Sequence, residues 1–339
     1  MDLVYIRKKG DVYESGYLSH YEIDFDVTSD TEFVTNDFAL KMILPDSPED
    51  LLFIENEIET IIFVEGTEYG GQISGTEINI ADNTITYTGR TWRGTLEQYI
   101  IEPPPGQDYR IVTGNLVTIL ESLPHSPYVE YQPASYSISS FQFDRYITLF
   151  DGMTKLLSAA DDSLRVSIEF IQTEGTYTGV AKTSLTKTRD LSGMVEVSQD
   201  FNDKIQLSIK RDGNTPKRLI CLGQGELHER EVINLYADDD WNITRTPIVG
   251  AYPVETYDFS SSEDLLSDGI KRYKELISNH KQIDVSISDL DIRLGDVISA
   301  RDHLTGENVQ AEITTIILKC SDYGDYQNET YEYKTKVRI

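Results

Sequence analysis

The stretch YTGRTWRGTLEQYIIEPPPGQDY, at residues 87–109, changes its pattern within a short distance. It begins with the alternation of a β-strand, and after Trp92 its apolar residues recur at helical spacing over Leu96–Ile100. Pro103–Pro105 end this predicted helix, because proline has no backbone N–H to donate and disfavours helix in the residue before it. The stretch therefore predicts a place where one domain gives way to another.

Arg90 and Arg93 flank Trp92, one of only 2 tryptophans in the chain. A tryptophan between arginines can stack on a sugar, a base or the surface of a partner. The other interpretation is that Trp92 plugs the joint between strand and helix while the arginines pair with nearby carboxylates. We favour the joint, and predict that Arg90, Trp92, Arg93, Pro103 and Pro104 form a domain junction or a subunit interface.

Strand-like alternation dominates the sequence before this stretch. Over Tyr21–Val27, apolar residues alternate with Glu22, Asp24 and Asp26, so one face of the predicted strand is apolar and the other is acidic. A turn at Ala81–Thr84 joins two further strands. The pattern predicts a β-meander that curls into a barrel or a sandwich.

Helical and strand patterns mix after the prolines. Leu116–Leu123 and Leu149–Leu157 have the spacing of short amphipathic helices, whereas Leu164–Phe170 and Tyr177–Lys182 alternate as strands. Such a mixed segment inside a β-rich chain predicts an inserted α/β domain.

The β pattern returns after Ser192 and is interrupted by one strong helix. Ser260 and Glu263 match a capping box, and Leu265–Ile277 carries an apolar stripe at helical spacing. A hairpin turn is expected at Leu304–Glu307, followed by a last alternating strand.

The predicted fold class is α+β and multidomain, in the order β, α/β, β, one helix and β.

The composition opposes several classes of function. The net charge of −28 disfavours nucleic-acid binding, which needs lysine and arginine on the phosphates, and fits a surface that must not adhere to DNA. The 2 cysteines, Cys221 and Cys320, form neither a disulfide framework nor a zinc pattern. We expect neither a membrane span nor a signal peptide, because the chain has no long apolar run and no basic-then-apolar start.

No catalytic motif is present in the sequence. It contains no Walker loop, no GxSxG and no HExxH, and the 5 histidines do not pair at a metal-ligand spacing. The acidic loop Asp238–Asp240 lacks the glycine and the distal glutamate of an EF-hand. We therefore expect no enzyme, no cofactor and no metal site.

Four segments resemble the tail hub, or baseplate hub, proteins of bacteriophages, in particular the N-terminal structural part of the tail-associated lysin of siphophages and prophages of Gram-positive bacteria. They are the opening stretch, FQFDRYITLFDGMTKLL at Phe141–Leu157, LICLGQGELHEREVINLY at Leu219–Tyr236 and IRLGDVISARDHLTG at Ile292–Gly306.

The resemblance implies a four-part fold, with two hub-forming β-barrel-like domains, an inserted α/β domain and a small helix-containing insertion. The corresponding boundaries are residues 1–92 with about 191–213 for the first β domain, 93–190 for the α/β insertion, about 214–252 with 281–339 for the second β domain, and 253–280 for the helical insertion.

The resemblance further implies a homotrimer, in which the two β domains of each chain give six around one axis. It implies a non-enzymatic virion protein at the distal end of the tail tube, which links the distal tail ring to a spike or fibre protein. It also implies that DNA passes without adhering and that assembly takes place in the host cytoplasm.

Two alternatives stay open at the sequence level, a cell-wall glycan-binding protein and a peptidoglycan hydrolase of the tail tip. The first would use Trp92, Trp241 and surface tyrosines, and the second would need two convergent carboxylates.

Overall fold

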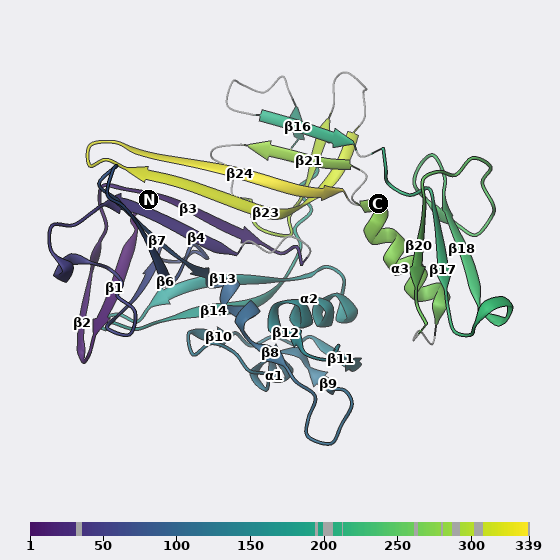
Figure 1. Cartoon of the computed structure of the whole chain (residues 1–339), viewed down its shortest axis with the longest axis horizontal. Helices are drawn as coiled ribbons and strands as arrows, with labels where there is room; N and C mark the ends of the chain where they lie inside the picture. The colour runs from purple at the N-terminus through teal and green to yellow at the C-terminus, as the bar shows by residue number, and fades with distance from the viewer. Residues whose placement is uncertain are drawn as a thin grey trace. The chain divides into compact units, whose positions relative to one another are not determined.

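The computed structural model describes residues 1–31, 36–193, 196–198, 206–211, 213–260, 264–278, 281–286, 292–301 and 308–337 (Figure 1). The chain forms two compact units. Unit 1 comprises Met1–Asp190, Ser286–Asp296 and Ile313–Tyr333. Unit 2 comprises Leu191–Val285, Val297–Glu312 and Lys334–Ile339. Strands account for 47% of the structure and helices for 15%, so strands set the architecture.

The first half of the chain, in unit 1, holds most of the secondary structure. Its strands and helices are β1 (Val4–Lys9), β2 (Val12–Tyr17), β3 (Tyr21–Thr28), β4 (Asp37–Ile43), β5 (Ile58–Phe63), β6 (Gly70–Asn79), β7 (Thr84–Thr91), β8 (Ile100–Ile101), β9 (Ile111–Asn115), α1 (Leu116–Glu121), β10 (Val129–Tyr131), β11 (Ser137–Gln142), β12 (Ile147–Thr148), α2 (Leu149–Ala160), β13 (Leu164–Gln172) and β14 (Gly179–Lys187).

The second half contributes to both units. The elements of unit 2 are β15 (Glu196–Ser198), β16 (Gln206–Arg211), β17 (Arg218–Leu222), β18 (Val232–Ala237), β19 (Ile243–Thr244), β20 (Val254–Asp258), α3 (Leu265–Ser278) and β22 (Val297–Arg301). The strands with residues assigned to both units are β21 (Lys281–Ser286), β23 (Asn308–Asp322) and β24 (Gln327–Val337).

A large antiparallel sheet forms the body of unit 1. It is not the simple meander that the sequence predicted, because β4 pairs with β7 and β1 pairs with β5. Its strand order is β24-β23-β3-β4-β7-β6-β5-β1-β2, and neighbouring strands from β23 to β2 pair antiparallel. The side chains of Ile23, Phe25 and Leu40 are fully buried on one face, as the period of two in a strand requires. Glu22 and Asp24 point to the other face, so the predicted alternation along β3 is confirmed.

The segment between β7 and β14 packs a small α/β layer against this sheet. β14 pairs antiparallel with β13 and parallel with β10, and the buried faces of α1 and α2 belong to the same apolar cluster as these strands. The cluster also includes Ile6, Ile61 and Phe63 from β1 and β5. The mixed segment therefore shares one core with part of the large sheet.

In unit 2, one helix covers a four-stranded sheet with the order β19-β18-β17-β20. Leu219 and Cys221 of β17 are buried with Leu265, Tyr273 and Ile277 of α3. The predicted apolar stripe of this helix is confirmed. The helix begins at Leu265, after Asp264, whose carboxylate accepts a hydrogen bond from the backbone N–H of Ser267 at 3.1 Å.

None of the sheets in the part of the chain that the structure describes closes into a barrel, so the prediction of β-barrel-like domains is not confirmed. Alternation along a strand determines which side chains face the core, but it says nothing about whether the first and last strands of a sheet meet. In unit 1, β2 ends the sheet and pairs only with β1 among the described strands.

The predicted helix over Leu96–Ile100 is wrong. Gly94–Gln98 form a short 3₁₀ turn, and Ile100–Ile101 form β8, which pairs with β12. The backbone N–H of Leu149 donates to the carbonyl of Tyr99 at 2.7 Å, so the local helical preference yields to strand pairing. The helices at Leu116 and Leu149 and the strands at Leu164 and Gly179 are confirmed.

Several predictions concern residues outside the described ones. Glu263 of the capping box and the hairpin turn at Leu304–Glu307 belong to this group. The four-part domain division stays a prediction.

Replacing Gly71 with alanine tests the packing of the large sheet. A Cβ at this position in β6 would lie 1.9 Å from the backbone carbonyl oxygen of Arg90. This oxygen belongs to the paired strand β7, so it cannot shift without moving the strand. We expect Gly71→Ala to lower the free energy of unfolding of unit 1 by about 1–3 kcal/mol or more, as overpacking does. Gly193→Ala is the matched control, because a Cβ there meets nothing within 4 Å. Urea denaturation in which both variants behave alike would contradict this packing.

Candidate functional site

Trp92 lies at the centre of the contact between the large sheet and the α/β layer. Its side chain is 1% exposed and stacks on Phe170 of β13, with ring centroids 4.3 Å apart and planes 6° apart. The ring centroids of Phe170 and Phe63 of β5 lie 4.6 Å apart, and those of Tyr128 and the Trp92 indole lie 5.7 Å apart. These rings connect the two layers of unit 1 through one aromatic cluster.

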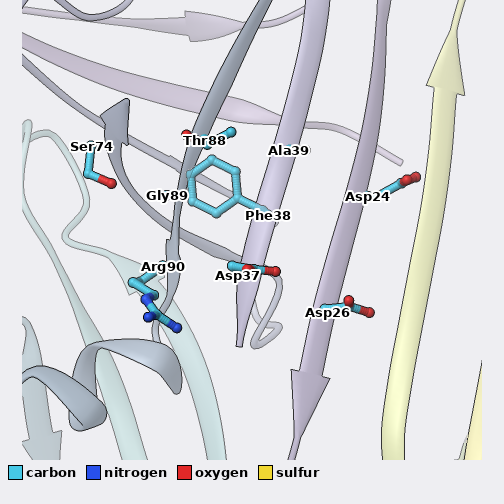
Figure 2. Close-up of a pocket in the computed structure, with 9 residues that line it drawn as sticks. All are labelled: Asp24, Asp26, Asp37, Phe38, Ala39, Ser74, Thr88, Gly89 and Arg90. Atoms are coloured by element: carbon cyan, nitrogen blue, oxygen red, sulfur yellow. The ribbon is translucent and has the colours of Figure 1, made fainter. Parts of the chain in front are cut away.

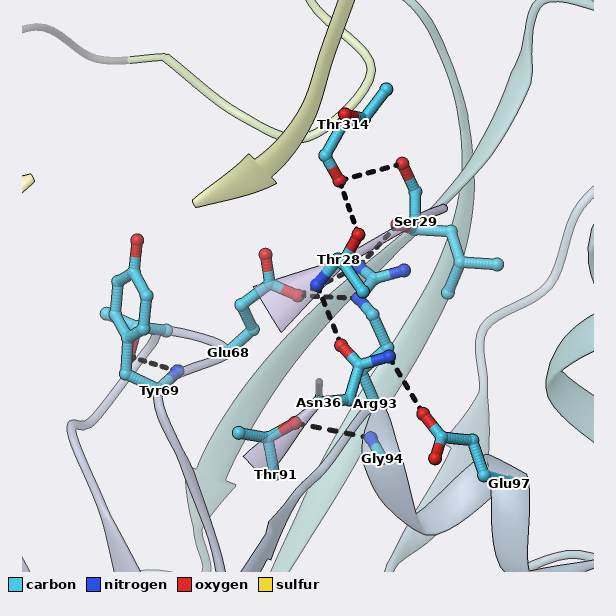
Figure 3. Close-up of polar contacts among 12 residues, drawn as sticks. Thr28, Ser29, Asn36, Glu68, Tyr69, Thr91, Arg93, Gly94, Glu97 and Thr314 are labelled. Carbon is cyan, nitrogen blue, oxygen red and sulfur yellow. Dashed lines mark hydrogen bonds and ion pairs between the residues drawn. The ribbon is translucent and has the colours of Figure 1, made fainter. Parts of the chain in front are cut away.

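Arg93 forms a buried ion pair beside this cluster (Figure 3). Its side chain is 3% exposed, and its Nη2 donates to Glu68 Oε2 at 2.8 Å and to the carbonyl of Val166 at 3.0 Å. Glu68 belongs to the loop before β6, whereas Val166 belongs to β13. One guanidinium therefore joins the sheet to the inserted segment, and its charge is neutralised where it is buried.

Arg90 reaches a second carboxylate in the same neighbourhood. Its Nη1 donates to Glu97 Oε2 at 2.9 Å, and Glu97 Oε1 accepts from Asn36 Nδ2 at 3.0 Å. Asn36 Oδ1 accepts from the backbone N–H of Thr28 at 2.7 Å. Burial raises the pKa of Glu97 above its usual value, and the hydrogen bond from Asn36 and the charge of Arg90 oppose that rise.

The hydrogen-bond chain continues from Thr28 across to β23. Thr28 Oγ1 donates to the carbonyl of Thr314 at 3.0 Å, and Ser29 Oγ donates to the same carbonyl at 3.3 Å (Figure 3). The end of β3 is thus fixed to both β23 and the 3₁₀ turn.

The indole N–H of Trp92 is buried and has no hydrogen-bond partner among the described residues. The backbone of Gly70 lies against it, since a Cβ at Gly70 would be 2.7 Å from Nε1. A side chain enclosed in this way cannot stack on a sugar, so the structure does not support Trp92 as a glycan-binding residue. Pro103 and Pro104 are half-buried in the loop after β8. The assignment of these five residues to a junction or an interface stays a prediction.

A polar groove of about 450 Å³ lies on the acidic face of the large sheet (Figure 2). Asp24 and Asp26 of β3 and Asp37 of β4 project into it, and Arg90 of β7 lines its end. The sequence alternation identified Asp24 and Asp26. It did not identify Asp37, which joins them because β4 pairs with β3 and places Asp37 opposite Arg90.

Partial burial of these carboxylates affects their protonation. Burial raises the pKa of Asp24, and the charge of Lys319 partly offsets the rise. Burial also raises the pKa of Asp37, and Arg90 partly offsets it. Both shifts disfavour the ionised carboxylates in the folded chain, so the two aspartates carry their charge at a small cost to folding stability.

The described residues contain no group of three side chains placed to hold a metal ion. Asp238 instead accepts hydrogen bonds from the backbone N–H groups of Asp240 and Asn242 at 2.9 and 2.8 Å, which closes its own loop. Burial raises the pKa of the Cys221 thiol to about 11, so it is a poor nucleophile. Among the described helices, none has the length and apolarity needed to cross a membrane.

Three solved structures have the same fold along nearly the whole chain. The 43 kDa tail protein of prophage MuSo2 from Shewanella oneidensis matches with a TM-score of 0.63 and 12% identity, over 99% of this chain and 98% of that one. The tail protein from Neisseria meningitidis MC58 matches with a TM-score of 0.59 and 12% identity, over 99% and 97%. This chain has the fold of prophage tail proteins.

Prophage tail protein gp18 from Listeria monocytogenes EGD-e also has this fold, with a TM-score of 0.56 and 10% identity over 99% of this chain and 94% of that one. No protein-family model and no curated protein sequence matches the chain. The chain therefore shares its fold with these tail proteins at only 10–12% sequence identity.

Truncating Trp92 tests whether this cluster holds unit 1 together. We expect Trp92→Ala to lower the free energy of unfolding by about 3–5 kcal/mol, as for other buried aromatic residues. Trp92→Phe should cost less, because the indole N–H that it removes has no hydrogen-bond partner among the described residues. Tyr109→Ala, at a ring that is 42% exposed, is the control. Normal stability of Trp92→Ala in urea denaturation, with loss of assembly only, would favour the interface over the junction.

The groove carboxylates give a pH prediction. The pKa of Asp24 is higher in the folded chain than in the unfolded chain, so folding disfavours the ionised carboxylate. The resulting loss of folding stability is complete once the pH exceeds the folded pKa. We expect Asp24→Asn to raise the free energy of unfolding at neutral pH. The gain should disappear as the pH falls below the ordinary value of 3.8, because the wild-type carboxyl is then neutral too. A gain that is independent of pH would show that the pKa is not the cause.

Proposed function

We propose that this chain is a structural, non-enzymatic protein of a bacteriophage or prophage tail. The observation that carries the proposal is the fold match to three tail proteins over 99% of the chain. The match extends over 94–98% of those chains as well, so it concerns the whole molecule rather than one common domain.

Within the tail we assign the chain to a trimeric hub at the distal end of the tail tube, where it links the tail ring to a spike or fibre protein. In this proposal the two β regions, residues 1–92 with about 191–213 and about 214–252 with 281–339, act as two hub domains. Three chains then place six similar domains around one axis. The segment 93–190 and the helical piece 253–280 lie outside the ring as insertions. The organisms of the similar proteins do not single out one class of host.

The acidic face of β3 and β4 gives the hub a passage for DNA. The chain carries a net charge of −28, and the groove concentrates Asp24, Asp26 and Asp37 on one sheet face. A negative lumen repels phosphates over about a Debye length, so DNA passes without adhering. We propose that this face lines the lumen and that the virion tail, after assembly in the host cytoplasm, is where the protein acts.

The glycan-binding and hydrolase alternatives receive no comparable support. Trp92 is enclosed at 1% exposure, and the similar proteins are named as tail proteins. A mixture of carboxylates on a sheet face is not by itself a hydrolytic pair, which needs two groups at a set separation across a substrate. We therefore propose no reaction, cofactor or metal for this chain.

Immunogold labelling of purified tails with an antibody against the α/β segment tests the assigned position. We expect gold only at the distal tip, at the end opposite the capsid. Labelling along the tube or at the capsid end would overturn the hub assignment.

Charge reversal of the groove tests the lumen. In a gel-shift assay at low salt, the wild-type chain should leave duplex DNA unshifted, because its acidic surface repels phosphates. The triple variant Asp24→Lys, Asp26→Lys and Asp37→Lys should retard the DNA, and the retardation should vanish as salt rises.

The matched control places the same charge change on exposed carboxylates of the α/β segment. It carries Glu102→Lys, Asp108→Lys and Glu121→Lys. Equal retardation by both triple variants would show that the groove has no special exposure to DNA. Thermal melts of all proteins establish that each variant is folded.

A further inference from the structure

A pocket of about 400 Å³ lies beside β13 in unit 1. Its lining residues come from the loop before β6, from β13 and β14, and from the segment 292–296, all of which belong to this unit. Val166 and Ile168 line the pocket although their side chains are buried in the apolar cluster with α1 and α2. These two residues therefore present their backbone to the pocket.

The backbone that reaches the pocket belongs to the outer edge of a sheet, because β13 is the last strand in the order β10-β14-β13. The N–H of Thr188 donates to the carbonyl of Ser163 at 2.8 Å, and the N–H of Thr173 donates to the carbonyl of Thr178 at 2.8 Å. Hydrogen bonding alternates along antiparallel strands. The odd-numbered residues of β13 therefore bond to β14, and the even-numbered ones direct N–H and C=O away from it.

One peptide group on this outer edge has no partner. The N–H of Phe170 donates to the carbonyl of Thr67 at 2.8 Å, and the carbonyl of Val166 accepts from Arg93 Nη2 at 3.0 Å. Ile168 lies between these two residues. Among the described residues, no group forms a hydrogen bond with its outward N–H or C=O.

An unpaired peptide group at Ile168 is unusual, because this residue is only 3% exposed. Most buried backbone N–H and C=O groups in proteins have a hydrogen-bond partner. A donor and an acceptor on the same edge of one residue are complementary to the backbone of an extended peptide, as in strand addition. The pocket therefore has the chemistry of a site for an added strand.

The charged residues of the pocket favour a basic segment. Lys187 and Arg189 are already ion-paired, with Asp161 at 2.9 Å and with Asp296 at 2.5 Å. Glu169, the neighbour of the unpaired residue, lines the pocket and is exposed, and it forms no ion pair within the described part of the chain. A lysine or arginine next to the paired residue of an added strand would lie opposite this carboxylate, whichever way the strand runs.

The arginine on the same face of β13 lies at its far end. Arg165 is four residues from Glu169, which is about 13 Å by the rise of a strand. Its Nη1 donates to the carbonyls of Asp162 and Leu164 at 2.7 and 2.9 Å. The net charge of −28 also favours a basic partner protein over a second copy of this acidic chain.

We propose that this pocket binds an extended, basic peptide segment of a partner protein, which adds to the edge of β13 and pairs with Ile168. The proposal goes beyond the assigned position in the tail. It rests on the pocket alone, so failure of the hub assignment in immunogold labelling would leave it intact, and its own failure would leave the hub assignment intact.

Amide hydrogen exchange, followed by NMR on the full chain, tests the free edge. Without ligand, the amide of Ile168 should exchange about tenfold or more faster than that of Ser167, which bonds to β14. The probe is a capped pentapeptide with valine between two lysines and threonine at both ends. At saturation we expect it to slow the exchange of Ile168 about tenfold or more and to leave Phe170 unchanged.

Two matched controls separate the backbone contact from the charge. The same peptide with N-methylvaline at its centre cannot donate to the carbonyl of Ile168 and should not slow the exchange. Glu169→Gln should weaken binding of the valine peptide about two- to fivefold, as for an exposed ion pair. Glu174→Gln makes the same charge change in the exposed turn after β13 and should bind like the wild type.

Three results would overturn the proposal. The first is an amide of Ile168 that exchanges as slowly as that of Ser167 in the free chain. The second is no slowing by the valine peptide or by its counterpart with a central glycine. The third is equal slowing by the N-methylated peptide. Equal binding to Glu169→Gln and Glu174→Gln would contradict the basic character of the segment.

Discussion

The contact between Trp92 and Phe170 is the interaction on which the structure of unit 1 depends. It stacks a ring from the end of the large sheet on a ring from the α/β layer at 4.3 Å, and Phe63 extends the cluster into β5. Next to it lies the buried Arg93–Glu68 ion pair. The Arg93 guanidinium also donates to the carbonyl of Val166, so its directional hydrogen bonds orient β13 relative to the large sheet. Apolar stacking supplies the stability, and the ion pair supplies the orientation.

The sequence predicted the parts of this arrangement that depend on neighbouring residues. Alternation along β3 identified its acidic and apolar faces, and helical spacing identified α1, α2 and α3. The interpretation of Trp92 as a plug agrees with its burial. Pairings between distant residues could not be predicted, because the alternation within one strand does not say which strand lies beside it or in which register. Arg93 with Glu68 and Asp37 opposite Arg90 are of this kind.

The unconfirmed barrels and the wrongly predicted helix share a physical cause. Barrel closure depends on whether the outermost strands meet, and the helix expected over Leu96–Ile100 gave way because β8 pairs with β12. Both outcomes are decided by contacts across the fold, which the local pattern does not contain.

The charge distribution connects this fold to its proposed role. A sheet with one apolar and one acidic face buries the first and presents the second, and three chains around an axis can turn the acidic faces toward a shared channel. The most direct test is a cryo-electron microscopy reconstruction of the tail tip that contains this protein. It should show three copies around one axis with Asp24 and Asp37 facing the channel. A reconstruction in which this face is turned outward, or in which the copies do not surround the channel, would contradict the account.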